Sequence, residues 1–212
     1  MVGCSAANAA DTSVLLAGWF AAQTNVHTWS ADAIQTRSIK TFSQPLVSTG
    51  KVWVVVPDRF RWELGQPAQT IAVRQPDQLW LCYPKLKRAE KYPLSGNQPG
   101  PWRDALALLE ASFPRSRAEL ESHFTVLSVV QTNALVQLSL QPKSAFARKF
   151  MSQIQISFHA EDFTPASTEL QFSDGSSMRN DFSHSVLNAA VPKELFEVQP
   201  GADTKVVEPL KK

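Results

Sequence analysis

Apolar and polar residues alternate at a spacing of two along most of the chain. In residues 59–64, Phe60, Trp62 and Leu64 fall on one side and charged residues fall on the other. Residues 153–158 alternate in the same way. Side chains of a strand point to opposite faces in turn, so this period predicts β-structure.

The same pattern, read between turn signals, predicts about 11 strands. They cover residues 31–42, 47–56, 59–64, 69–74, 78–83, 86–92, 123–130, 135–140, 153–158, 167–172 and 178–182. Two segments have helical spacing instead. These are residues 12–27, with Leu15, Leu16, Trp19, Phe20 and Val26, and residues 102–113; residues 115–121 add a further turn.

Helices are too few for a parallel doubly wound sheet, so the predicted fold class is α+β, mainly β and antiparallel. A large antiparallel sheet with two helices cannot cover both of its faces. It is expected to roll up, with a concave face that either packs on the helices or leaves a cavity. An unfilled apolar cavity usually holds a ligand.

Size and charge narrow the possible functions. The chain has 212 residues, 43% of them hydrophobic, which suits one domain over residues 11–212. A net charge of +2 gives no reason to expect a nucleic-acid partner. The longest apolar run, Val52 to Val56, is far shorter than the roughly 20 residues of a membrane-spanning helix.

The N-terminal residues 1–10 indicate export. Gly3-Cys4 is typical of a lipoprotein junction at which the cysteine is acylated, and Ala7-Asn8-Ala9 fits cleavage by ordinary signal peptidase. We favour the second interpretation and keep lipidation of Cys4 as the alternative. Cys82 lies in an apolar run and is interpreted as a small buried hydrophobe rather than a reactive thiol.

The sequence contains no pattern that calls for catalysis. The four histidines are isolated from one another and lack metal-ligand spacing. A glycine-rich phosphate loop and a G-x-S-x-G turn are absent. We therefore expect no catalytic residue, no metal and no cofactor. The basic run over residues 85–91 is interpreted as a solvated strand face, with contact to anionic head groups or an acidic partner as the alternative.

Residues 53–63 resemble the signature of the LolA family, the periplasmic carriers of outer-membrane lipoproteins. The shared pattern is Trp-hydrophobic-x-x-Pro-x-x-Phe-x-Trp, from Trp53 to Trp62. Further segments match the family in order. They are Trp29 to Gln35, Leu79 to Pro84, Leu138 to Lys143, Asp174-Gly175, and the later Asn188, Val191, Phe196 and Pro200-Gly201.

The resemblance implies an unclosed (half) β-barrel with helices lying over its mouth as a lid. It implies a periplasmic monomer whose apolar interior receives lipoprotein acyl chains from an inner-membrane lipoprotein-releasing transporter and yields them to an outer-membrane acceptor. Phe60 corresponds to a family phenylalanine that engages the transporter. A Phe60→Glu change is expected to disrupt transfer without unfolding the chain.

This interpretation predicts residues for the wall of the cavity and for its lid. The expected wall residues are Val54, Val56, Phe60, Trp62, Ile71, Val73, Leu79 and Leu81, each with plain core packing as the alternative. The expected lid is the helix over residues 102–113, which covers the empty cavity with Leu106, Leu109 and Phe113 because exposed apolar surface promotes aggregation.

Three departures mark a divergent member that serves another lipid or lipoprotein. Val56 replaces the arginine that holds the family's lid shut, Gln75-Pro76 replaces an Asp-Gly, and the lid segment contains Trp102. Three rival functions stay open. They are a membrane-anchored LolB-like acceptor or lipoprotein sensor with the same fold, an enzyme acting on lipids inside the cavity, and a purely structural β-protein.

Overall fold

The computed structural model describes residues 9–94 and 113–209, and most of them are in strands. Twelve strands occur in this part of the chain. They are β1 Thr28–Ser38, β2 Leu46–Val55, β3 Arg59–Leu64, β4 Thr70–Gln75, β5 Gln78–Tyr83, β6 Arg88–Pro93, β7 Phe124–Thr132, β8 Leu135–Pro142, β9 Met151–His159, β10 Pro165–Phe172, β11 Ser177–Leu187 and β12 Lys205–Val207.

Few helices accompany these strands. They are α1 Ala9–Gln23, α3 Arg117–His123, α4 Ala145–Phe150 and the 3-10 turns η1 Pro84–Leu86 and η2 Lys193–Phe196. No helix of the described segments is long and apolar enough to cross a membrane. The predicted helix over residues 102–113, with Leu106 and Leu109, lies outside the described residues except for Phe113.

The strands follow one order, β12-β6-β5-β4-β3-β2-β1-β11-β10-β9-β8-β7, and the sheet is unclosed. Neighbouring strands pair antiparallel wherever their register is defined, except β12, which pairs parallel with β6. The predicted mainly-β antiparallel class is confirmed. β12 and α4 were not predicted.

The described residues form two compact units. The first comprises residues 9–26, Thr36–Leu46 and 113–182, and the second comprises His27–Gln35, 47–94 and 183–209. The division falls within β1, β2 and β11. A single domain over residues 11–212 stays a prediction.

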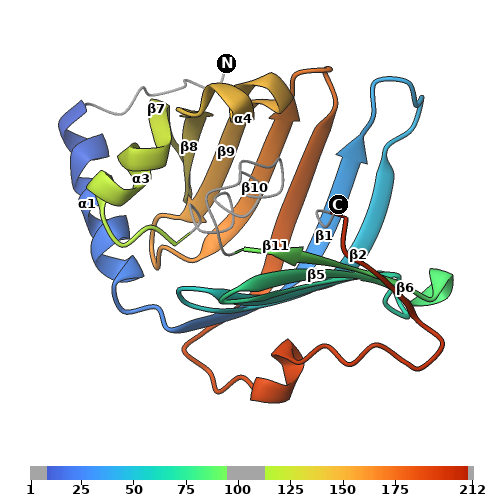
Figure 1. Cartoon of the computed structure of the whole chain (residues 1–212). Coiled ribbons are helices and arrows are strands. Elements are labelled where there is room, and N and C mark those ends of the chain that lie inside the picture. The colour runs from blue at the N-terminus through green and yellow to red at the C-terminus, as the bar shows by residue number, and fades with distance from the viewer. Residues whose placement is uncertain (1–8, 95–112, 210–212) are drawn as a thin grey trace. The chain divides into compact units, whose positions relative to one another are not determined.

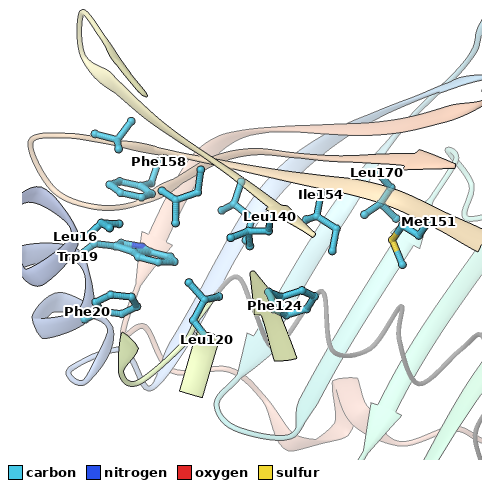
Figure 2. Close-up of a cluster of buried hydrophobic side chains, with 13 residues drawn as sticks. Leu16, Trp19, Phe20, Leu120, Phe124, Leu140, Met151, Ile154, Phe158 and Leu170 are labelled. Atoms are coloured by element: carbon cyan, nitrogen blue, oxygen red, sulfur yellow. The ribbon is translucent and has the colours of Figure 1, made fainter. Parts of the chain in front are cut away.

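The first unit has a dry core between its helices and one face of its strands (Figure 2). Leu138 of β8 and Ile156 of β9 are paired across the strands, and both are at most 2% exposed. From α1, the ring of Trp19 stacks on that of Phe158, with centroids 4.9 Å apart. Burial of these large side chains is the main stabilising term of this unit.

The other face of the same strands is polar, as the alternation predicts. Gln137 of β8 and Gln155 of β9 are joined by a hydrogen bond of 2.5 Å on that side. Arg179 of β11 forms an ion pair with Asp181 at 2.6 Å. In this unit, therefore, helices α1 and α3 cover the apolar face, as Figure 1 illustrates, and the polar face lies opposite them.

Candidate functional site

The register of β2 to β5 in the second unit collects apolar side chains on one face. Residues directly opposite each other in an antiparallel pair share a face. Trp62 of β3 is opposite both Val52 of β2 and Ala72 of β4, and Ala72 is in turn opposite Leu81 of β5. We call this surface the Phe60 face. It consists of the apolar residues Val52, Val54, Phe60, Trp62, Ala72, Leu79 and Leu81, together with Arg74, which lies opposite both Phe60 and Leu79.

Side chains of the Phe60 face differ in exposure. Phe60 is 5% exposed and Leu79 is 6% exposed, whereas Trp62 and Leu81 are half-buried. A glutamate at Phe60 would place a charge in a buried site, which is costly when the charge is unpaired. The sequence predicted that Phe60→Glu leaves folding intact, but this burial makes loss of folding the expected effect. Trp62 and Leu81 are the better positions for testing binding.

The C-terminal segment Pro192–Thr204 packs on the opposite face of these strands. Arg61 donates from Nη1 to the carbonyl oxygen of Leu195 at 3.0 Å and is paired through Nε with Glu63 at 2.6 Å. Gln75 donates from Nε2 to the carbonyl oxygen of Phe196 at 2.7 Å. The ring of Phe196 is 4% exposed. This face is therefore covered by the chain itself.

A cavity of about 810 Å³ lies between that face and the C-terminal segment. Its sheet side is formed by Ile71, Val73, Cys82 and Ala89, and its other side includes Leu195 and Val198. Burial raises the pKa of the Cys82 thiol, and Arg61 offsets this only in part. A raised pKa keeps the thiol protonated at neutral pH, so Cys82 is a poor nucleophile.

The structure separates the eight predicted wall residues. Val54, Phe60, Trp62, Leu79 and Leu81 belong to the Phe60 face, whereas Ile71 and Val73 lie on the opposite face and line the cavity described above. The sequence could not assign β4, because its three successive residues from Ile71 to Val73 are all apolar and present no alternation.

The remaining predicted residues lie elsewhere. Val56 follows the end of β2, and its backbone N–H donates to the carbonyl oxygen of His27 at 3.0 Å. Phe113 belongs to the first unit and is 8% exposed. Cys4, Leu106 and Leu109 lie outside the described residues. The sequence analysis did not predict that the C-terminal segment covers this face. The segment accepts hydrogen bonds through its backbone carbonyls, and any residue type can supply a backbone carbonyl.

Contacts of the basic run over residues 85–91 favour its interpretation as a solvated strand face. Lys87 pairs with Asp203 at 2.6 Å, and Arg88 pairs with Glu90 at 2.7 Å. The ammonium of Lys91 lies 5.3 Å from the centroid of the Trp80 ring. Most cations of this run are thus matched within the chain.

Several ion pairs of the second unit lie at the surface. His184 and Lys51 both contact Asp32, at 3.0 and 3.5 Å, but this group is at the surface and includes no nucleophile. Within residues 9–94 and 113–209, no group of three His, Cys, Asp or Glu side chains could hold a metal ion. The distinctive feature of the second unit is the alignment of apolar side chains on one face of its sheet.

Comparison with known proteins identifies the family. The sequence profile described as "Outer membrane lipoprotein carrier protein LolA" matches residues 24–199. An outer-membrane lipoprotein carrier protein of Dechloromonas aromatica is 22% identical over 183 residues, which cover 86% of this chain and 82% of the relative. A protein of the same description from Coxiella burnetii is 26% identical over 160 residues, covering 76% and 71%.

Similarity to a solved structure supports the fold of this chain and no further property. An uncharacterised conserved protein of Thermus thermophilus superposes with a TM-score of 0.51 at 10% identity, covering 94% of this chain and 98% of that chain. The profile match runs from the end of α1 through η2 and so includes every strand except β12. The chain therefore belongs to the LolA family, whose description is outer membrane lipoprotein carrier protein.

Proposed function

We propose that this chain is a periplasmic carrier that binds the acyl chains of a lipoprotein, or of a related lipid, on its Phe60 face. The observation that carries the proposal is the alignment of apolar side chains from β2, β3, β4 and β5 on that one face. Membership of a carrier family supports the same function. In this proposal the chain is not an enzyme.

Binding to this face has to be strong enough to shield hydrocarbon and weak enough to permit release. Each fully buried methylene contributes about 0.8 kcal/mol, so several acyl chains buried completely would not leave. Trp62 and Leu81, which are half-buried, provide a surface that desolvates a chain only in part.

The proposed pathway follows from the family. Cargo arrives from an inner-membrane lipoprotein-releasing transporter and leaves to an outer-membrane acceptor, with the carrier acting as a monomer. Val56 stands where the resemblance places a latch arginine, so the proposal does not include that latch. That difference suits cargo other than the usual lipoproteins.

Neighbouring residues on opposite faces allow a matched test. Leu81 points to the Phe60 face, and Cys82 points to the face that the C-terminal segment covers. Leu81→Trp and Cys82→Trp add bulk on either side of one strand. We expect Leu81→Trp to weaken binding of a dansyl-labelled fatty acid by about tenfold or more, and Cys82→Trp to leave it within about twofold.

The measurement is a fluorescence titration, with a triacylated lipopeptide as competitor and thermal melts to verify folding. Weakening by Cys82→Trp alone would move the binding site to the cavity under the C-terminal segment. Absence of any probe binding by the unmodified chain would reject the carrier function.

Gly3-Cys4 favours a second candidate, a membrane-anchored acceptor with the same fold. Such a protein would carry acyl groups on Cys4 and would receive cargo rather than shuttle it. Intact-mass measurement of protein extracted from membranes distinguishes the two. A mass increase of the size of attached acyl groups supports the acceptor, and cleavage after Ala9 supports the carrier.

A further inference from the structure

Three segments meet at one end of the first unit around the turn that joins β10 to β11 (Figure 1). The backbone N–H of Ser173 donates to the carbonyl oxygen of Phe150 at 2.9 Å, and its hydroxyl donates to that of Arg148 at 3.1 Å. On the other side of the turn, the backbone N–H of Lys40 donates to Oγ of Ser176 at 3.4 Å. The turn thus holds α4 beside the β1–β2 loop.

Large aromatic side chains are exposed on both segments. Phe150 at the end of α4 is 49% exposed, and Phe42 in the β1–β2 loop is 54% exposed. Phe146 supports Phe150, one helical turn away, with ring centroids 5.1 Å apart. Neither Phe42 nor Phe150 lines the cavity of the second unit. Two half-exposed aromatic rings on segments that the same turn joins offer apolar surface to a partner.

Basic side chains surround these rings. Residues 39–46, 143–150 and 173–176 contain four cationic residues, Lys40, Lys143, Arg148 and Lys149, and one acidic residue, Asp174. All four cationic residues are exposed. Hydrogen bonds from Ser176, together with nearby Lys40, lower the pKa of Asp174, so this carboxylate is ionised. The four cationic residues still outnumber this one negative charge.

The backbone beneath these side chains is well fixed. Ser144 caps α4 by accepting from the backbone N–H of Ala147 at 3.2 Å. Arg148 donates from Nη1 to the carbonyl oxygens of Pro142 and Lys143, at 2.9 and 2.6 Å. The loop of Phe42 is closed by a hydrogen bond from its own N–H to the carbonyl oxygen of Ile39 at 2.9 Å.

We propose that this end of the first unit docks on the surface of a membrane that contains anionic lipids. We call the docking surface the tip patch, defined by Lys40, Phe42, Lys143, Arg148, Lys149 and Phe150. Exposed aromatic rings enter the boundary between head groups and acyl chains, while neighbouring lysine and arginine side chains contact the anionic head groups. The proposal goes beyond acyl-chain binding, because it assigns the chain a contact with the bilayer itself.

Charge complementarity favours the tip patch over the basic run of residues 85–91 as the site that contacts anionic lipids. There, Lys87 and Arg88 are matched by Asp203 and Glu90, which leaves little net charge. In the tip patch, positive charges exceed negative ones and flank aromatic rings on separate segments. A bilayer can contact all these segments at once, because its surface is continuous.

Co-sedimentation with vesicles tests the proposal on the full chain. Vesicles containing phosphatidylglycerol should bind the protein, and vesicles of phosphatidylcholine alone should not. Binding should weaken as salt is added, because the charges are exposed. Lys40→Gln combined with Lys149→Gln should weaken binding about 25-fold, since each basic residue near an anionic surface contributes about fivefold.

Phe150→Ser, and separately Phe42→Ser, should each weaken binding by about tenfold. Both positions are exposed, so both variants are expected to fold, and a thermal melt verifies this. Matched controls are Val14→Ser, on a residue of α1 that is 73% exposed, and Lys193→Glu on η2. The controls should bind vesicles like the unmodified chain.

Several results would overturn the proposal. They are failure to bind anionic vesicles, equal loss in the controls and the tip-patch variants, or binding of a polyacidic peptide without binding of vesicles. The last result would assign the patch to a protein partner instead. Binding of the dansyl-labelled fatty acid is measured in parallel. If that binding persists while vesicle binding fails, only the tip patch is rejected; the reverse result rejects the carrier function alone.

Discussion

Tyr92 on β6 shows how a single hydroxyl is tied to the fold. Its Oη donates to Oε2 of Glu90 at 2.7 Å. Burial, reinforced by this hydrogen bond and the negative charge of Glu90, raises the pKa of Tyr92 from 10.0 to about 12. The folded state therefore holds the phenolic proton more tightly than the unfolded state, and the resulting stabilisation is complete only below the unfolded pKa.

Stability should accordingly fall as the pH rises from about 10 towards about 12, and Tyr92 should account for part of that fall. Tyr92→Phe removes the titrating group, so the free energy of unfolding should decline less steeply over this interval. Urea unfolding at a series of pH values measures the slope. Equal slopes for Tyr92→Phe and the unmodified chain would contradict the assignment. Burial also raises the pKa of Tyr83, so Tyr83→Phe measures the share of the fall that the other tyrosine contributes.

Single residues also show which face assignments could be predicted from the sequence. Within β3, the alternation that put Phe60 and Trp62 on one face was confirmed by the register. Across strands it failed for Ile71 and Val73, because β4 is apolar on both faces. One face of β4 packs under the C-terminal segment, and that contact joins residues far apart in sequence. Local pattern has no access to such a contact.

Among the elements, those bounded by strong turn signals were predicted best. β3 Arg59–Leu64 and β5 Gln78–Tyr83 have the predicted bounds. β12 Lys205–Val207 was missed because it is three residues long and is fixed by pairing with β6, not by its own period. α4 was missed for a related reason, since its six residues are too few to show a helical period.

Phe196, which is 4% exposed, anchors the C-terminal segment in addition to the hydrogen bonds from Arg61 and Gln75. Phe196→Ala should lower the free energy of unfolding by about 3–5 kcal/mol, because it removes a buried ring and leaves a cavity. Leu195→Ala, at a half-buried neighbour, should cost less. Urea unfolding measures both. In a Cys4→Ser background, Phe196→Ala should also speed alkylation of Cys82, whose thiol lines the cavity beneath the segment. An unchanged rate would show that the segment stays in place without this ring.

For the whole molecule, antiparallel order followed from the lack of helices between strands, but the division into two units did not. That division depends on which strands pair at long range, and β1, β2 and β11 each contribute residues to both units. Hydrophobic periodicity assigns a residue to a face of its own strand only. The family resemblance predicted the unclosed sheet, which periodicity could not predict, because the resemblance depends on the order of motifs over residues 24–199.

A carrier should be stabilised by its cargo as a whole, because a ligand that binds only the folded state shifts the unfolding equilibrium. At a free concentration one hundredfold above Kd, the gain is about 2.7 kcal/mol. For a chain of this length that corresponds to a rise in Tm of roughly 5–10 °C.

Hexadecanoate should therefore raise Tm at concentrations where butyrate does not, because each additional buried methylene strengthens binding. Leu81→Trp, with binding weakened tenfold or more, should reduce the rise by about half or more, and Cys82→Trp should retain it. A rise in Tm that is independent of chain length would point to a surface effect of the carboxylate, and would count against an apolar binding face.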